Sequence, residues 1–220
     1  MSYSEAPPPP HLAPYIEALW TSTSNQPVDS FPIHPDGCMD ILLDHTGQTR
    51  LIGAMPVTQN FSSPAGFHIK GIRFHPGILP SILPINAAEI AGQSLDIRSF
   101  SIHQIRPTPL TPIQRAITHL RQHHGNANLD WLADQTNLSI RHFRRLTLSL
   151  TGLSPKHLAR ILRFRRALHL KTIDPNSTWT SAALNAGYFD QAHFIRDHRA
   201  LTGQTPTMAE TYNSKRSEHS

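Results

Sequence analysis

Two segments in the second half of the chain carry the side chains best suited to chemistry, and they repeat each other. At matching places each copy has a small alanine, a polar residue able to cap a helix, a phenylalanine and an arginine: Ala133, Ser139, Phe143 and Arg145 correspond to Ala183, Asp190, Phe194 and Arg196. The offset is 50 residues at the alanine and 51 at the other three positions, so the second copy has one more residue in its turn. Arginine can donate two hydrogen bonds to guanine O6 and N7, and glutamine, present in the second copy, can pair with adenine in the same way. The chemistry that these segments predict is the reading of DNA bases.

Each copy needs a short helix, a tight turn and a second helix to place these side chains. The second helices are predicted to begin after Ser139 and Asp190, because both residue types cap helix N-termini. The alanine lets the first helix pack closely, and the phenylalanine anchors the second helix to the core. The outer face of each second helix is left to polar and basic side chains, which is the organisation of a helix-turn-helix whose second helix enters the major groove.

Helical periodicity extends through this half from Ile113. A long helix is predicted to follow the cap at Ser154, with an apolar stripe of Leu158, Ile161, Phe164 and Leu168. Asp174-Pro175 ends it, since proline disfavours helix in the residue before it. Further helices are expected over residues 179–186 and 190–201. The second half is therefore predicted to be all-α.

The C-terminal half resembles the AraC/XylS family of bacterial transcription regulators over about residues 112–210. The resemblance depends on several spaced matches in the right order: Leu132-Ala133, residues 139–145, Thr151-Gly-Leu-Ser-Pro155, the basic helix ILRFRRALHL, Ala182-Ala183, residues 186–190, Phe194, Arg196 and Thr202-Gly-Gln-Thr-Pro206. It implies two helix-turn-helix units joined by the long helix, about Pro155–Ile173, with recognition helices in successive major grooves. It also implies double-stranded DNA and RNA polymerase as partners.

The resemblance assigns roles position by position. The implied base-reading residues are Arg141, Arg144, Arg145, Gln191, Ala192, His193 and Arg196. The implied phosphate-contacting residues are Lys156, Arg160, Arg163 and Arg166. The chain departs from the family pattern at Thr147 and His198, where the family usually has an aromatic residue, so both recognition helices are expected to dock differently or less stably. A competing interpretation makes Arg145 and Arg196 intradomain salt-bridge partners, and makes the arginines of the long helix a solvated face.

The first half has a different character. It holds 16 of the 19 prolines within residues 1–112, so long helices are excluded there. Strands are predicted over residues 15–21, 39–44 and 66–74, and short helices over 76–83 and 86–91, the latter capped by Asn86. The segments 34–43 and 71–79 resemble a small, cupin-like domain found in front of helix-turn-helix units in some regulators. A small-molecule pocket is expected there, with Trp20, Phe31 and Phe74 as its predicted lining.

The predicted fold class is a two-domain α+β chain with a small β-rich, cupin-like N-terminal domain and an all-α C-terminal domain. The expected divisions are a disordered proline-rich lead-in (1–10), a β-rich, sensor-like domain (11–105), a linker (106–112), a double helix-turn-helix DNA-binding domain (113–210) and a disordered tail (211–220). Charge follows the same division. Residues 1–112 have five Lys/Arg and eight Asp/Glu, whereas residues 113–210 have thirteen and six, as expected if only the second domain meets phosphates.

Other functions find little support in the sequence. No nucleophile elbow, phosphate loop or HExxH motif is present, so we predict no enzyme, no catalytic residue and no cofactor. His34, His68 and His75 lack a tight ligand spacing, and no metal site is predicted. Cys38, the single cysteine, is interpreted as a small buried hydrophobe, because nearby carboxylates would raise its pKa.

No signal peptide and no membrane-length apolar run is seen, so the expected location is the cytoplasm. The main alternative keeps DNA binding and gives the N-terminal domain a role in dimerisation or protein contact, with no ligand. A structural or interaction module, in which the basic faces are incidental, also stays open, as does a homodimer.

Overall fold

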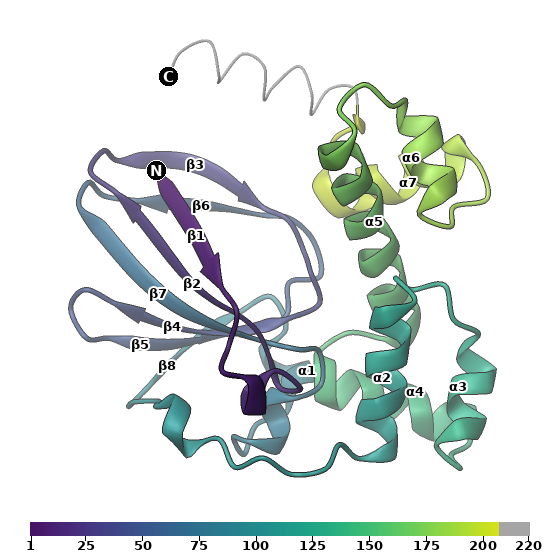
Figure 1. Cartoon of the computed structure of the whole chain (residues 1–220), viewed down its shortest axis with the longest axis horizontal. Coiled ribbons are helices and arrows are strands. Elements are labelled where there is room, and N and C mark those ends of the chain that lie inside the picture. Colours follow the sequence, from purple (N-terminus) through teal and green to yellow (C-terminus); the bar gives the residue numbers. More distant parts are fainter. Residues whose placement is uncertain (207–220) are drawn as a thin grey trace.

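The computed structural model describes residues 1–206, so the predicted tail at 211–220 lies outside the described residues. The chain divides into a β-rich N-terminal half and a helical C-terminal half that lies along one side of it (Figure 1). This is the α+β organisation that the sequence predicts. No helix within residues 1–206 is long and apolar enough to cross a membrane.

The N-terminal half contains a six-stranded antiparallel sheet and a two-stranded antiparallel sheet. The larger sheet has the order β1-β2-β7-β4-β5-β8, and the smaller one pairs β3 with β6. The strands are β1 (Ser2–Ala6), β2 (Ile16–Ser24), β3 (Val28–Ile33), β4 (Met39–Asp44), β5 (Thr49–Ile52), β6 (Gln59–Ser63), β7 (Phe67–Phe74) and β8 (Ser94–Ile97). The three strands predicted from the sequence are β2, β7 and β4, which lie side by side at the centre of the larger sheet.

Two predictions of secondary structure in this half are wrong. Residues 1–10, expected to be a disordered lead-in, contain β1. This strand pairs antiparallel with β2, from Ser2 opposite Thr23 to Ala6 opposite Leu19. All five residues of β1 are exposed, so the strand has no alternation of apolar and polar residues to reveal it. The helix expected over 76–83 is only a 3₁₀ turn, Leu79–Ser81. The helix after Asn86 is confirmed as α1 (Ala87–Ile90), whose cap side chain accepts a hydrogen bond from the Ala88 N–H.

The C-terminal half consists of six helices within the described residues: α2 (Pro112–Gln122), α3 (Leu129–Gln135), α4 (Ile140–Thr151), α5 (Pro155–Ile173), α6 (Trp179–Asn185) and α7 (Gln191–Thr202). Thr111 caps α2 through a capping box with Gln114. One helix-turn-helix unit, α3–α4, lies at one end of α5, and the other, α6–α7, lies at its far end (Figure 1). One connected apolar core runs through both halves, from Leu12 and Phe74 to Phe164 and Leu201.

Candidate nucleic-acid interface

The two second helices, α4 and α7, begin as the repeat predicts. Ser139 accepts a hydrogen bond from the His142 N–H, and Asp190 accepts one from the His193 N–H. Phe143 and Phe194 are almost completely buried and anchor the two helices to the core. Each helix ends on a glycine in the left-handed region, Gly152 after α4 and Gly203 after α7.

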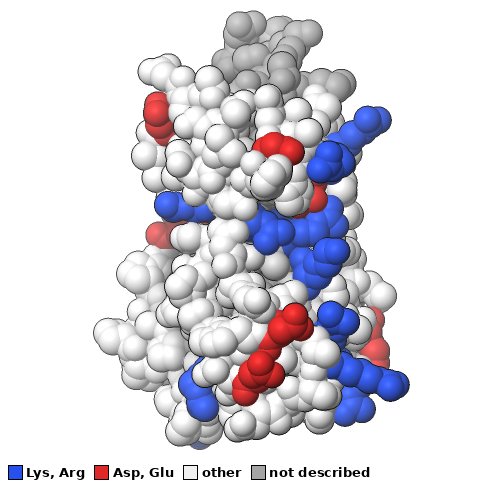
Figure 2. Space-filling view, turned by 90° about the vertical axis from the view of Figure 1, so that its right-hand side faces the viewer, with Lys and Arg blue, Asp and Glu red and all other residues white. Residues whose placement is uncertain are grey.

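The residues predicted to read bases lie on the N-terminal half of each second helix. Arg141, Arg144 and Arg145 are exposed on α4; Gln191, Ala192 and Arg196 are exposed on α7, where His193 is half-buried. N-terminal positions are the part of a recognition helix that usually contacts base edges. Lys and Arg side chains follow one edge of the face in Figure 2 along the length of the helical half, with a few acidic residues among them.

Arg145 and Arg196 form no ion pair with any residue in the described part of the chain. Nη2 of Arg145 lies 3.1 Å from Nε2 of His142, one turn back. The salt-bridge interpretation of these two arginines therefore has no support within residues 1–206.

The four predicted phosphate-contacting residues have different surroundings. Lys156 is exposed and Arg166 is half-buried. Arg160 donates to the Asp197 carboxylate through Nε and Nη2, both at 2.9 Å, and so joins α5 to α7. Arg163 donates to the Gly125 carbonyl and lies over the Tyr188 ring. Arg160 and Arg163 thus have structural partners, and their contact with phosphate remains a prediction.

The two departures from the family pattern are accommodated differently. The His198 ring is buried and lies 5.5 Å from the Phe164 ring and 5.6 Å from the Phe194 ring, so it fills the aromatic position. Burial lowers the pKa of His198, although its hydrogen bond to the Gln204 carbonyl opposes that shift. Thr147, at the corresponding position of α4, is also buried, and its hydroxyl has no hydrogen-bond partner among the described residues.

One exposed aromatic residue was missed by the sequence interpretation. Phe189 is 88% exposed and immediately precedes the capping Asp190, next to the predicted base-reading Gln191 and Ala192. Nothing in the pattern singled it out, because a phenylalanine within a helical repeat is normally interpreted as core. Phenylalanine can contact a thymine methyl group, so its exposure at this position fits a DNA-facing surface.

The three predicted pocket residues of the N-terminal domain do not line one common hollow. Trp20 lines a hollow of about 340 Å³ beside β1, β2, β4 and β7, and neither Phe31 nor Phe74 is among its lining residues. Phe74 is fully buried and packs edge-on against Phe100, so it cannot line an open pocket. Phe31 lies on β3, opposite Phe61 of the smaller sheet, while the Trp20 indole donates to Asp40. A hollow of about 270 Å³ lies elsewhere in this half, lined by residues from β4 to β7: Leu42, Asp44, His45, Gln48, Arg50, Phe61, Ser62, Ser63, Pro64, Phe67 and Ile69.

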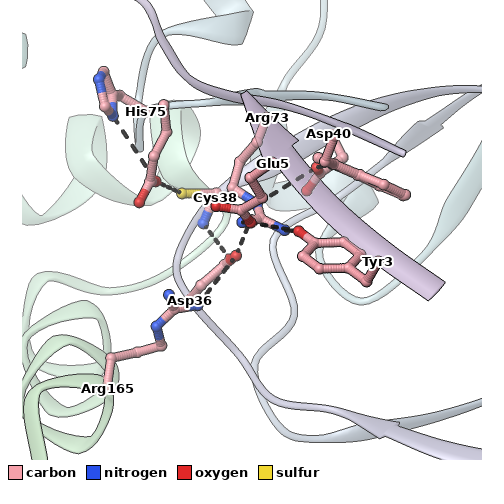
Figure 3. A network of polar contacts seen from close by, with 10 residues as sticks. Tyr3, Glu5, Asp36, Cys38, Asp40, Arg73, His75 and Arg165 are labelled. Atoms are coloured by element: carbon pink, nitrogen blue, oxygen red, sulfur yellow. Dashed lines mark hydrogen bonds and ion pairs between the residues drawn. The ribbon is translucent and has the colours of Figure 1, made fainter. Parts of the chain in front are cut away.

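A polar cluster lies where the β-rich half meets α5 (Figure 3). Arg73 pairs with Glu5 at 2.7 Å, Asp36 at 3.3 Å and Asp40 at 3.6 Å. Burial and the neighbouring Asp36 raise the pKa of Asp40 to about 7. Arg165 of α5 reaches Asp36 from the opposite side, at 3.5 Å.

Cys38 lies at the edge of this cluster and is buried. Its thiol contacts the Glu17 carboxylate, and burial followed by the charge of Asp36 raises its pKa well above the usual range. Cys38 is therefore buried, as the sequence predicts, but its thiol lies beside a carboxylate and not in a purely apolar setting. No cluster of three or more His, Cys, Asp or Glu within residues 1–206 has a metal-binding arrangement.

Comparisons with known proteins cover both halves. Residues 132–210 match a family model described as a helix-turn-helix domain, and residues 4–96 match one described as a domain of unknown function, DUF6597. None of the curated proteins compared with the chain matches it.

Solved structures give weaker likenesses. The C-terminal domain of AraT, a response regulator from Geobacillus stearothermophilus, is 23% identical, with a TM-score of 0.41, over 47% of this chain and 85% of that one. ToxT from Vibrio cholerae is 9% identical, with a TM-score of 0.48, over 87% of this chain and 96% of that one. ToxT with an unsaturated fatty acid bound is 10% identical, with a TM-score of 0.47, over 87% of this chain and 94% of that one. These TM-scores are low, and the domain assignment depends on the family models.

Proposed function

We propose that this chain, whose C-terminal half is an AraC-type helix-turn-helix domain and whose N-terminal half is a DUF6597 domain, is a sequence-specific transcription regulator that reads two successive major grooves. The observation that carries the proposal is that both recognition helices are anchored by a buried phenylalanine and leave their N-terminal halves free. The helix between the two units, α5, has 19 residues and therefore spans about 28 Å at 1.5 Å per residue. That length is comparable to the roughly 34 Å between successive major grooves on one face of DNA.

The proposed roles are those that the family resemblance implies, and the mostly exposed positions of these side chains support them. Arg141, Arg144 and Arg145 read one groove, and Gln191, Ala192, His193 and Arg196 read the next. Among the four proposed phosphate contacts, Lys156 and Arg166 have neither a competing ion pair nor a competing side-chain hydrogen bond within residues 1–206, whereas Arg160 and Arg163 have such partners. RNA polymerase is a further proposed partner, on the resemblance alone.

Selecting bound sequences from a random DNA pool tests the proposal. The purified protein should enrich a site with two short conserved blocks about one turn apart. Lys156→Ala should weaken binding to all sequences alike and lower the slope of log affinity against log salt by about one. Enrichment of no sequence, or salt-independent binding, would leave the chain an interaction module with incidental basic faces.

For the N-terminal domain we propose a small-molecule effector. The hollow between β4, β5, β6 and β7 supports this role, since Leu42, Phe61, Phe67 and Ile69 offer an apolar floor and Arg50 a polar rim. A ligand that binds the folded domain should raise the melting temperature of the full chain by mass action. If a broad metabolite screen produces no such shift, the alternative of dimerisation or protein contact without a ligand is favoured.

A further inference from the structure

The first helix-turn-helix unit is held by the β-rich domain at the C-terminal end of its recognition helix. Gly152 follows α4 with a φ of 75°, and a Cβ atom added there would lie 2.8 Å from the Ala87 carbonyl oxygen of α1 and 3.1 Å from Ala91 Cβ. Helix α1 therefore packs directly on the last turn of α4. Gln114 of α2 adds a hydrogen bond to the Gly77 carbonyl oxygen at 3.2 Å.

The second unit is held at the corresponding end of its own recognition helix. The Thr58 N–H donates to the Leu201 carbonyl oxygen, in the last turn of α7, at 2.7 Å. Carbonyls in the last turn of a helix have no partner within the helix, so this bond satisfies an otherwise free group. Two residues earlier, the Pro56 carbonyl lies 2.7 Å from Nε2 of His157 on α5.

The helix between the units is held as well. A Cβ atom added to Gly37 would lie 2.5 Å from Cδ1 of Leu158, so the β-rich domain approaches α5 as closely as a glycine permits. The His34 ring packs edge-on against Phe164, 5.8 Å between centres. Asp36, fixed by Arg73, pairs with Arg165 (Figure 3). Loops and helix α1 of the β-rich domain thus contact both ends and the middle of the DNA-binding half.

We infer that the DUF6597 domain is a brace that sets the distance and orientation of the two recognition helices, and so fixes the spacing between the two DNA half-sites. The inference rests on the proposed function. The brace holds both recognition helices by their C-terminal turns and leaves their N-terminal halves free. Two linked modules gain most when they are pre-organised to match the span between their sites, because less orientational freedom is lost on binding. Gly37, Thr58 and Gly152 are positioning residues and do not contact DNA themselves.

Matched glycine pairs test the brace in the full chain. Gly37→Ala adds a methyl group against α5, whereas Gly47→Ala brings the same left-handed strain, at a φ of 84°, with no atom of the described residues within 4 Å. Gly152→Ala adds a methyl group against α1, whereas Gly203→Ala, at the corresponding place after α7, meets no atom of residues 1–206 within 4 Å. The readout is affinity for the selected DNA site, for the same site with one or two base pairs added between its half-sites, and for each half-site alone.

The wild-type chain should lose affinity about tenfold or more when the spacing changes. Gly37→Ala and Gly152→Ala should bind the native spacing about threefold to tenfold more weakly and discriminate less between spacings, with half-site affinities unchanged. Both control variants should keep the wild-type spacing profile. A wild-type profile in Gly37→Ala and Gly152→Ala would overturn the brace and leave the proposed function intact, whereas a wild-type chain that binds no DNA would remove the proposed function itself.

Arg165→Ala covers the case in which the glycine variants do not fold. It removes the ion pair with Asp36 and adds no atoms, and the Arg165 side chain is already 43% exposed. It should relax the spacing preference in the same direction as Gly37→Ala, while its melting temperature stays near that of the wild type. A folded Arg165→Ala chain with an unchanged spacing profile would also overturn the brace.

Discussion

At its predicted reading positions the first helix-turn-helix unit presents three exposed arginines on α4, whereas the second presents a glutamine, an alanine, a half-buried histidine and one arginine on α7. Their interiors differ too. The partly buried Leu146 of α4 packs against the apolar core. At the corresponding position α7 has the buried Asp197, which pairs with Arg160 of α5. The same backbone plan therefore supports one unit through apolar packing and the other partly through a buried ion pair. The first recognition surface is strongly basic, and the second offers more varied hydrogen bonding to bases.

The largest expected effect separates the two interiors. Asp197→Ala removes the partner of Arg160 and leaves a half-buried guanidinium unpaired, so the free energy of unfolding should fall by about 3 kcal/mol. Leu146→Ala, at the corresponding position of α4, loses only partly buried apolar contacts and should cost about 2 kcal/mol. Urea-induced unfolding measures both variants. A cost below about 1 kcal/mol for Asp197→Ala would show that the second unit does not depend on this pair.

The next effect concerns the two reading surfaces. Arg145→Ala and Arg196→Ala should each weaken binding to the selected DNA by about 1–3 kcal/mol and relax specificity at base pairs roughly one turn apart. Affinities for a panel of single-base variants of the site measure this. If both variants lose thermal stability and keep their sequence preference, the arginines are structural. If only one changes specificity, the chain reads a single groove.

The repeat could be predicted because its signals are local. A capping Ser139 or Asp190, an anchoring phenylalanine and a helical period specify each second helix before any tertiary contact is known. The polar β1 and the proline-containing β3 gave no such signal, since their pairing depends on strands that are distant in sequence. The roles of Arg160 and Arg163 were also out of reach, because Asp197 and Gly125 come near them only in the folded chain.

The two units also differ in the residue that precedes the cap of the second helix. At the corresponding position the first unit has Leu138, which packs partly against the core, whereas Phe189 is almost fully exposed. Phe189→Ala should leave thermal stability unchanged and weaken DNA binding by about 0.5–1 kcal/mol, mainly at sites that place a thymine nearby. Ile173→Ala, which also changes a largely exposed apolar residue but lies at the end of α5, is the matched control. Equal affinities for both variants and the wild type would exclude Phe189 from the interface.

The smallest expected effect comes from pH, and it again separates the units. Burial lowers the pKa of His198 in the folded chain, whereas α4 has the non-titrating Thr147 at the same position. Between the lowered folded pKa and the unfolded value of about 6.5, the unfolded chain binds more protons, so stability falls as the pH falls through this window. Burial also lowers the pKa of His34 and His75, which adds to the loss for the whole chain.

Hydrogen exchange of the α4 and α7 amides can resolve the local part of this effect. Acidification from about pH 7 to about 5.5 should lower the free energy of opening of α7 more than that of α4. The difference between the two losses should be below about 1 kcal/mol. His198→Phe keeps an aromatic ring beside Phe164 and Phe194 but cannot take up a proton, so it should remove this difference. If the difference persists in His198→Phe, a titratable group other than His198 must couple pH to the second unit. Equal loss of protection in α4 and α7 of the wild-type chain would instead mean that the shared core opens as one unit, and that the two helix-turn-helix units differ in what they read but not in how they are held.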